Sequence, residues 1–199
     1  MREFWNERYS TDTFVYGTKP NHFFKQKLDA IDYTGDLLLP LEGEGRNAVY
    51  AASKGWNVDA FDFSEEAKRK AINFARQQGL RISYDVLDAS DYFPTTAYYD
   101  VVGIVFAHFP PDVRINFHRK LIKGLKPGGH IILEVFHKDQ IGNNTGGPPN
   151  IDLLYSTDDL QSDFNELDML YFEHLTVQLD EGPFHKGQAE VIRLHAQTK

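Results

Sequence analysis

The chain of 199 residues contains no cysteine. Disulfide bonds, thiolate nucleophiles and cysteine-bound zinc or iron–sulfur clusters are therefore excluded. Positive charge is also scarce, because 21 Lys and Arg stand against 29 Asp and Glu and give a formal net charge of −8. A surface that neutralises many phosphates is difficult to build from this composition, so we expect no nucleic acid partner.

Long apolar runs are lacking too. The longest run, residues 101–107, is far shorter than the ~20 residues that cross a bilayer. The N-terminus is charged and lacks the apolar segment of a signal peptide. We therefore expect a cytoplasmic protein without membrane contact. The length suits one domain, and we expect a monomer or a weak homodimer.

Apolar, strand-like segments alternate with helical patterns along most of the chain. Strands are predicted at residues 36–41, 58–61, 81–84, 100–106 and 131–135, and helices at 46–54, 65–78 and 113–125. This alternation predicts an α/β fold with a doubly wound, mostly parallel sheet. A glycine- and proline-rich loop at 137–149 and a short helix at 156–164 follow. Strand-like runs at 169–179 and 189–196 then predict an antiparallel pair that closes the sheet.

A glycine-rich loop follows the first predicted strand. Gly43-Glu44-Gly45-Arg46-Asn47-Ala48 matches the pattern G-x-G-x-x-G/A, in which glycines let the backbone approach a ligand. The helix that follows offers free N–H groups at its N-terminus. Asp62 ends the next predicted strand, where a carboxylate can accept hydrogen bonds from both ribose hydroxyls. These features favour a binding site for a nucleotide cofactor. The alternative is a glycine turn that binds no ligand, with Asp62 serving only as a cap.

Nicotinamide dinucleotides and S-adenosylmethionine both use this arrangement, and three features favour S-adenosylmethionine. In a dinucleotide fold the first glycine usually follows the strand directly, whereas Pro40-Leu41-Glu42 intervene here. The chain ends in an antiparallel pair instead of a second mononucleotide unit. Glu42 and Glu44 place negative charge in the loop, which suits a sulfonium cation and repels a pyrophosphate.

Several stretches of the chain resemble one enzyme family. LEGEGRNAV at residues 41–49, FDFS at 61–64 and LKPGG at 125–129 resemble class I S-adenosylmethionine-dependent methyltransferases. FWNERY at 4–9, YGTKPN at 16–21, FAHFPP at 106–111 and TGGPP at 145–149 resemble, more narrowly, the tellurite-resistance and thiopurine methyltransferase-like branch. The likeness implies a Rossmann-like, seven-stranded sheet with an antiparallel last strand. It also implies a single methyltransferase domain over residues 1–199, with an aromatic lid at residues 1–35.

The resemblance further implies which residues contact the cofactor. They lie in the glycine loop, at the ends of the second, third and fourth strands, and in the lid: Glu42, Gly43, Glu44, Gly45, Asn47, Asp62, Phe63, Ser64, Asp85, Val86, Phe106, Tyr9 and Tyr16. One departure concerns the methionine amine. Many class I enzymes carry an acidic residue and a glycine where Leu39 and Leu41 stand here, so Glu42 is the candidate for that contact.

Methyl transfer from a sulfonium is an in-line displacement, in which a hard oxygen acceptor needs a base and a soft sulfur, selenium or tellurium acceptor does not. His108 and Arg114, after the fourth strand, are the predicted catalytic residues, with Arg114 either holding an anionic acceptor or covering apolar surface with its stem. His118, His137 and His185 are weaker base candidates, and His118 fits a helix surface better. No two histidines have metal-ligand spacing, so no metal is predicted.

These observations predict an S-adenosylmethionine-dependent methyltransferase for a small-molecule acceptor. The acceptor is expected to be a soft nucleophile, either a thiol or a chalcogen oxyanion such as tellurite or selenite. One alternative is a non-catalytic nucleotide-binding or sensing module of the same fold, because no base is obligatory. An NAD-binding oxidoreductase is the other.

Overall fold

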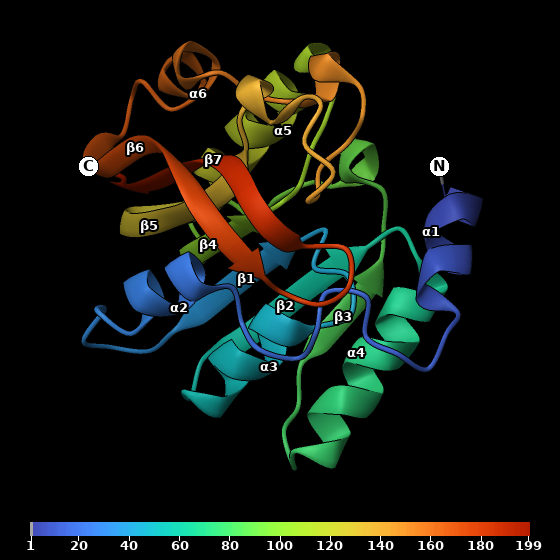
Figure 1. Ribbon diagram of the computed structural model, residues 1–199. Helices are drawn as coiled ribbons and strands as arrows, with labels where there is room; N and C mark the ends of the chain where they lie inside the picture. Colours follow the sequence, from blue (N-terminus) through green and yellow to red (C-terminus); the bar gives the residue numbers. More distant parts are fainter. Residues whose placement is uncertain (1) are drawn as a thin grey trace.

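The computed structural model describes residues 2–199, apart from the side chains of Arg2 and Phe4. Met1 and the side chain of Phe4, both in the predicted lid, therefore lie outside the described part. The centre of the molecule is one sheet of seven strands in the order β3-β2-β1-β4-β5-β7-β6 (Figure 1). The strands are β1 (Asp36–Pro40), β2 (Asn57–Asp62), β3 (Ser83–Val86), β4 (Tyr99–Val105), β5 (Leu125–Phe136), β6 (Asp168–Asp180) and β7 (Lys186–Gln197).

Strand β7 is antiparallel to both of its neighbours, β5 and β6, whereas all other paired strands are parallel. The last strand is thus the one that opposes the others, and the predicted α/β sheet is confirmed. The main difference lies in β5, which begins at Leu125 instead of residue 131. Leu125 pairs with Tyr99, and the register then shifts so that the next pair is Val101 with His130. Residues Lys126–Gly129 therefore lie within the bounds of β5.

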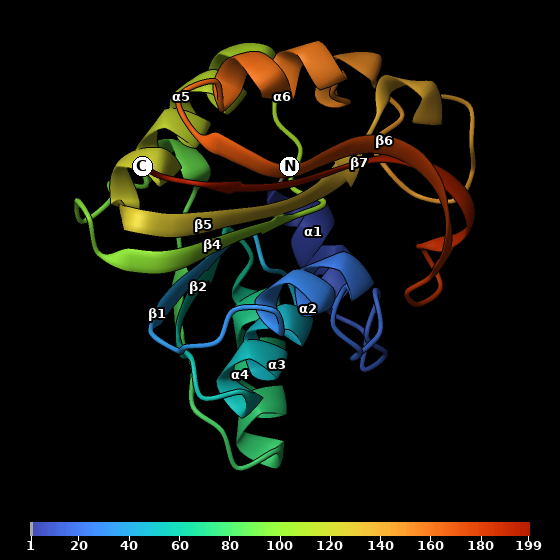
Figure 2. The ribbon, with the colours of Figure 1, turned by 90° about the vertical axis from the view of Figure 1, so that its left-hand side faces the viewer.

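Helices cover both faces of the sheet. Figure 2 shows α5 (Pro111–Gly124) and α6 (Thr157–Asp163) on one face, and α2 (His22–Leu28), α3 (Arg46–Ser53) and α4 (Glu65–Gln77) on the other. Short 3₁₀ turns lie at η1 (Ala89–Asp91), η2 (Lys138–Gln140) and η3 (Ile151–Leu153). Among residues 2–199, no helix is long and apolar enough to cross a membrane.

Two helices near the N-terminus, α1 (Arg2–Tyr9) and α2, have no counterpart in the sequence prediction. Their aromatic residues show no clear helical period, because α2 is only seven residues long and presents Phe23, Phe24 and Leu28 to the sheet. Asn21 caps α2 by accepting a hydrogen bond from the amide of Phe24. In β4, a Cβ atom on Gly103 would lie 2.6 Å from the Phe24 ring, so glycine is what allows α2 to pack so closely.

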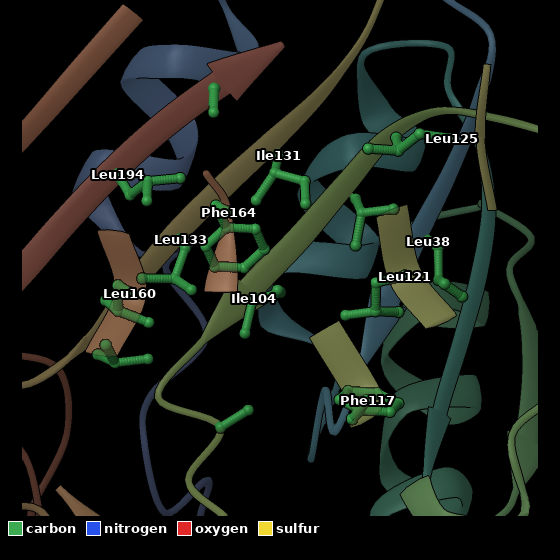
Figure 3. Close-up of a cluster of buried hydrophobic side chains, with 14 of the residues drawn as sticks. Leu38, Ile104, Phe117, Leu121, Leu125, Ile131, Leu133, Leu160, Phe164 and Leu194 are labelled. Atoms are coloured by element: carbon green, nitrogen blue, oxygen red, sulfur yellow. The ribbon is translucent and has the colours of Figure 1, made fainter. Parts of the chain in front are cut away.

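The core on the other face of the sheet joins α5 and α6 to the central strands (Figure 3). Phe117 and Leu121 of α5 are buried there beside Ile104 of β4 and Leu133 of β5. Because β4 and β5 are covered on both faces, residues 101–105 of β4 and 131–136 of β5 are apolar apart from Glu134. This packing holds the carboxyl ends of β1, β4 and β5 in fixed positions, where the candidate site is built.

Candidate cofactor and acceptor site

The carboxyl ends of β1 and β4 lie side by side, at the point where the strand order reverses. Ligands of open α/β sheets bind outside such a switch point. Leu41 follows β1 with φ at 51°, and Phe106 follows β4 with φ at 52°. Both residues have the left-handed backbone that non-glycine residues adopt rarely, and such strain clusters at ligand sites.

The glycine loop is held between three elements. Gly45 is the N-cap of α3 with φ at 89°, and a Cβ there would lie 2.6 Å from Ala71 of α4. A Cβ on Gly43 would lie 2.9 Å from the hydroxyl of Tyr9, the last residue of α1. The hydroxyl of Tyr84 in β3 donates to the carbonyl of Gly43 at 2.6 Å. Both glycines are therefore required by close packing on the loop.

Asp62 is buried at the end of β2, directly beside the glycine loop. Its Oδ2 accepts a hydrogen bond from the amide of Gly43 at 3.3 Å, and its Oδ1 accepts one from the amide of Ser64 at 2.9 Å. Burial raises the pKa of Asp62 to about 6, against the lowering effect of these amides. Each carboxylate oxygen has a second lone pair, so the side chain retains the capacity to accept two ribose hydroxyls.

Glu42 binds the N-terminus of α3. Its Oε1 accepts hydrogen bonds from the amides of Asn47 and Ala48 at 2.7 and 2.8 Å, and its Oε2 accepts one from the Asn47 side chain. Burial raises the pKa of Glu42 to about 7. A carboxylate offers about four acceptor positions, so one of them is left for the predicted contact with the methionine amine.

Glu44 is engaged differently from the prediction. Its buried carboxylate forms an ion pair with Lys70 of α4 at 2.5 Å and accepts a hydrogen bond from the amide of Val15 at 2.7 Å. The prediction that Glu44 presents negative charge to the cofactor is therefore wrong, because Lys70 neutralises that charge. Glu44 instead fastens the N-terminal segment to α4.

Asn47 and Ser64 also serve the N-terminal segment. Asn47 accepts a hydrogen bond from the amide of Asn21 at 2.9 Å and donates to Glu42. The hydroxyl of Ser64 donates to Asn6 at 2.6 Å and caps α4 by accepting from the amide of Ala67. Both polar side chains thus have partners within the chain, and their contacts with the cofactor stay predictions.

On β3, side-chain direction separates neighbouring residues. Tyr84 is buried and reaches the glycine loop, whereas Asp85 is exposed because successive strand residues face opposite sides. The turn after Val86 approaches Asp62 more directly, since the amide of Leu87 donates to the carbonyl of Asp62 at 2.9 Å. Asp88, at the start of η1, is a carboxylate in this turn that the sequence analysis missed. Cofactor contacts of Asp85 and Val86 stay predictions.

The N-terminal segment crosses the glycine loop and meets the turn between β6 and β7 (Figure 1). Arg46 donates to the carbonyl of Tyr16 at 3.3 Å and pairs with Glu181 at 2.8 Å. Asn21 donates to Glu181 at 3.1 Å and to Glu134 at 2.7 Å. Sequence analysis missed this group of polar side chains. Glu134, a charged residue within an apolar strand, was the signal that could have revealed it.

Four rings gather where β4 and β5 end. His185 lies with its ring centre 4.4 Å from Tyr16, 4.6 Å from Phe106 and 5.3 Å from Phe136. Phe106 and Phe136 are stacked at 4.6 Å. The Nδ1 atom of His185 is buried without a hydrogen-bond partner among the described residues and lies 3.7 Å from Glu181. We call these four rings the aromatic cage.

Two findings bear on whether His185 can accept a proton. Burial, with a further effect of Arg46, lowers the pKa of His185, so its imidazole is neutral near pH 7 and can take up a proton. Gly146 in the loop after β5 packs directly on the ring, because a Cβ there would lie 2.8 Å from Cδ2 and 3.3 Å from Nε2. The absence of a side chain at residue 146 therefore lets the loop approach the Nε2 edge of the ring.

Neither predicted catalytic residue has a free functional group, although the His108 ring stacks on Phe136 of the cage at 5.6 Å. His108 has both ring nitrogens bound to the backbone, Nδ1 to the carbonyl of Leu153 at 2.8 Å and Nε2 to the amide of Phe136 at 3.3 Å. Burial lowers the pKa of His108 to about 4. A ring held in this way is not available as a base, so this assignment is corrected.

Arg114 is 4% exposed and forms ion pairs with Asp163 at 2.8 Å and Asp159 at 3.2 Å. Its guanidinium joins α5 to α6 and is not presented to an anionic acceptor, which corrects the second assignment. His118 lies on the same interface, where it is buried and bonded to Asp163 at 2.8 Å. The expectation of a helix-surface histidine is wrong as well, because α6 covers that position.

Comparisons with known proteins agree with this geometry. Residues 42–129 match a family described as a methyltransferase domain. A thiopurine S-methyltransferase from Vibrio atlanticus (strain LGP32) is 24% identical, over 74% of this chain and 75% of that protein.

Solved structures share the fold. A methyltransferase dependent on S-adenosylmethionine, from Methanosarcina mazei, superposes with a TM-score of 0.71 at 17% identity, over 90% of this chain and 98% of that one. TehB from Haemophilus influenzae gives 0.72 at 14% identity, over 100% of this chain and 67% of that one. The family match thus makes residues 42–129 similar to a methyltransferase domain, and the chain has the fold of S-adenosylmethionine-dependent methyltransferases, so S-adenosylmethionine is the cofactor that these similarities indicate.

Proposed function

We propose that this methyltransferase methylates a small, soft nucleophile at the aromatic cage, and that the preferred acceptor is a thiol. The observation that carries the proposal is the position of His185. The neutral imidazole of His185 lies between Tyr16, Phe106 and Phe136. These rings adjoin the switch point of the sheet, where open α/β sheets bind their ligands. Residues 1–199 act in this proposal as one methyltransferase domain, with residues 1–35 as its lid.

The residues present fit the cofactor. We propose that Asp62 accepts the ribose hydroxyls, that Gly43 and Gly45 keep the loop open to the ligand, and that Phe63 and Phe106 flank it. Tyr9 and Tyr16 close over it from the N-terminal segment. When bound, S-adenosylmethionine supplies an electrophilic methyl group. The chain orients the acceptor and excludes water, an effect that can be worth up to about 7–11 kcal/mol.

His185 is proposed as the group that receives the acceptor proton. The carboxylate of Glu181 lies 3.7 Å from Nδ1, which favours a proton on Nδ1 and leaves the lone pair on Nε2. Gly146 keeps the space next to Nε2 free of a side chain. A thiol held there can lose its proton to Nε2 as its sulfur attacks the methyl group. A thiol already ionised needs no such transfer.

Charge and shape favour a thiol over an oxyanion. Arg114, the group predicted to hold an anion, is bound within the fold, and so is His108. Arg46, which adjoins the cage, is paired with Glu181. Aromatic faces offer apolar, polarisable surface, which suits sulfur. The curated relative is a thiopurine S-methyltransferase, and this supports the same acceptor class and the narrower branch of the family.

A product screen by mass spectrometry tests the proposal. The purified protein is incubated with S-adenosylmethionine and with small aromatic and aliphatic thiols, selenite or tellurite. We expect methylthio products from the thiols. Methylation of selenite or tellurite alone would overturn the thiol assignment. Cofactor binding without methylation of any acceptor would favour the non-catalytic module instead.

The variant His185→Gln tests the role of the cage. We expect turnover of a thiol at pH 7 to fall by about tenfold or more, in the range typical of a lost proton acceptor. The loss should shrink as pH rises and the free thiol ionises. His22→Gln, an exposed histidine on α2, is the matched control and should match the parent. An equal loss at every pH would show that His185 serves only packing.

A further inference from the structure

A second group of potential ligands lies outside the cage, on β6, β7 and the turn after β5. One ligand atom each from His137, Asp139 and His174 lies within 4.8 Å of the others. The rings of His137 and His174 are stacked with their centres 3.7 Å apart. Glu190 of β7 adds a fourth group, because its Oε2 lies 3.1 Å from Nε2 of His174. Methyl transfer as proposed above uses none of these side chains.

The strands bring these residues together. In the ladder between β6 and β7, Thr176 pairs with Glu190, two residues along from His174. The amide of His137 donates to the carbonyl of Glu190 at 2.9 Å, which places the end of β5 beside them. The chain separates the two histidines by a loop and a helix, so a search for ligand spacing along the sequence could not find them.

The four side chains match the donor set of a divalent transition-metal ion. Zinc-type ions are bound by imidazole nitrogens and carboxylate oxygens, commonly in fourfold coordination. The cluster contains two carboxylates and two imidazoles. The neighbouring Lys138 is not directed at these carboxylates, because it forms an ion pair with Asp159 at 2.9 Å. The carboxylate of Glu190 is already oriented, since its Oε1 accepts a hydrogen bond from Thr176 at 2.7 Å. Such outer contacts are typical of metal ligands.

The site is open to solvent on one side. A cavity of about 650 Å³ is lined by Asp139, Glu190, Gln188 and the loop residues 142–145. The side chain of Asp139 is 67% exposed and free to turn toward an ion. At present the amide of Asp139 donates to Nδ1 of His137 at 3.0 Å. A metal ion on Nδ1 would replace this bond, and the exposed amide could then bind water.

We propose that His137, Asp139, His174 and Glu190 bind a zinc-type divalent metal ion. The ion would join the turn after β5 to the β6–β7 pair. Gln140 extends this link, because it accepts a hydrogen bond from the amide of Glu190 and donates to the carbonyl of Gly146, which packs on His185. The metal site would therefore steady the loop over the aromatic cage without taking part in methyl transfer.

Titration of the metal-free full chain with Zn²⁺ tests the proposal by calorimetry, and Co²⁺ provides a visible spectrum. We expect one ion to bind per chain. His174→Ala and Asp139→Asn should each weaken Zn²⁺ binding by about tenfold or more and change the Co²⁺ spectrum. Asp139→Asn is useful because this exposed residue is not needed for folding. Hydrogen exchange of residues 138–147 should slow when Zn²⁺ is added.

His130→Ala is the matched control, since His130 contacts His195 at 3.1 Å at a histidine pair without carboxylates. Its Zn²⁺ affinity should equal that of the parent. Two outcomes would overturn the proposal. One is the absence of saturable Zn²⁺ binding, which would leave Glu190 as only a hydrogen-bond partner of His174. The other is equal affinity in the parent, His174→Ala and Asp139→Asn chains, which would place the ion elsewhere.

Discussion

The rings of His185 and Phe106 lie 4.6 Å apart in an edge-to-face arrangement, although the two residues are far apart along the chain. Phe106 follows β4 with a left-handed backbone, and His185 lies in the turn between β6 and β7. This contact joins the switch point of the sheet to its antiparallel edge. It places the acceptor chemistry on the turn that also holds the N-terminal segment through Glu181.

Asp62→Ala should weaken binding of S-adenosylmethionine while the fold is retained. Each hydrogen bond from a charged group contributes about 1.5–3 kcal/mol, so the loss of two should weaken binding at least about tenfold. Calorimetry measures the dissociation constant. Because burial raises the pKa of Asp62 to about 6, affinity in the parent should also rise as pH increases through that value.

Asp85→Ala is the comparison for this variant, since Asp85 is the exposed carboxylate on the neighbouring strand. A loss of affinity in Asp85→Ala as large as that in Asp62→Ala would restore Asp85 as a cofactor contact. An unchanged dissociation constant in Asp62→Ala would show that Asp62 only ties β2 to the glycine loop.

Glu42→Gln should change how stability depends on pH. Burial raises the pKa of Glu42 to about 7 from an ordinary value of 4.5, so the folded chain keeps a proton that the unfolded chain releases between these values. The free energy of unfolding therefore falls as pH rises from about 4.5 to 7. Glutamine removes this contribution, which we expect to be about 3 kcal/mol.

Urea unfolding at pH 5 and pH 8 measures the effect. The difference in unfolding free energy between variant and parent should shift in favour of Glu42→Gln at the higher pH. A difference that is the same at both pH values would mean that Glu42 titrates normally in the folded chain.

Lys70→Met should loosen the N-terminal segment. Lys70 pairs with Glu44 and donates to the carbonyls of Thr11 and Thr13 at 2.7 and 2.8 Å. Its removal leaves a buried carboxylate without its cation, which costs about 3–5 kcal/mol when the segment stays in place. Hydrogen exchange of residues 11–16 should therefore become faster, and added cofactor should slow it in the parent. Lys68→Met, on the same helix, is the control.

Arg114→Ala should destabilise the chain and leave the acceptor site intact. Its ion pairs with Asp159 and Asp163 join α5 to α6, and loss of one partner of a buried pair costs about 3–5 kcal/mol. Thermal unfolding measures this loss. In the folded fraction, KM for a thiol should match that of the parent. A raised KM with unchanged stability would return Arg114 to the acceptor site.

The sheet and the glycine loop at its carboxyl end could be predicted from the sequence alone. Apolar periodicity depends on short segments, so the residues of β4 or α4 show their structure without knowledge of their neighbours. Gly43, Gly45 and Asp62 were also identified, because a glycine loop and a strand-end carboxylate are recognised from local order along the chain. The short α1 and α2 escaped, since tertiary packing of Phe23 and Phe24 stabilises α2 more than any repeat in its sequence.

Only the tertiary structure decided which polar side chains remain available for chemistry. Glu44 and Arg114 have the right residue types near the right strand ends, yet Lys70 and Asp163, far away along the chain, take up their charges. His185 shows the opposite case, because Tyr16 and Phe106 reach it from distant segments. A side chain's partners are set by the fold in three dimensions, and burial then sets its charge. Local sequence order carries neither.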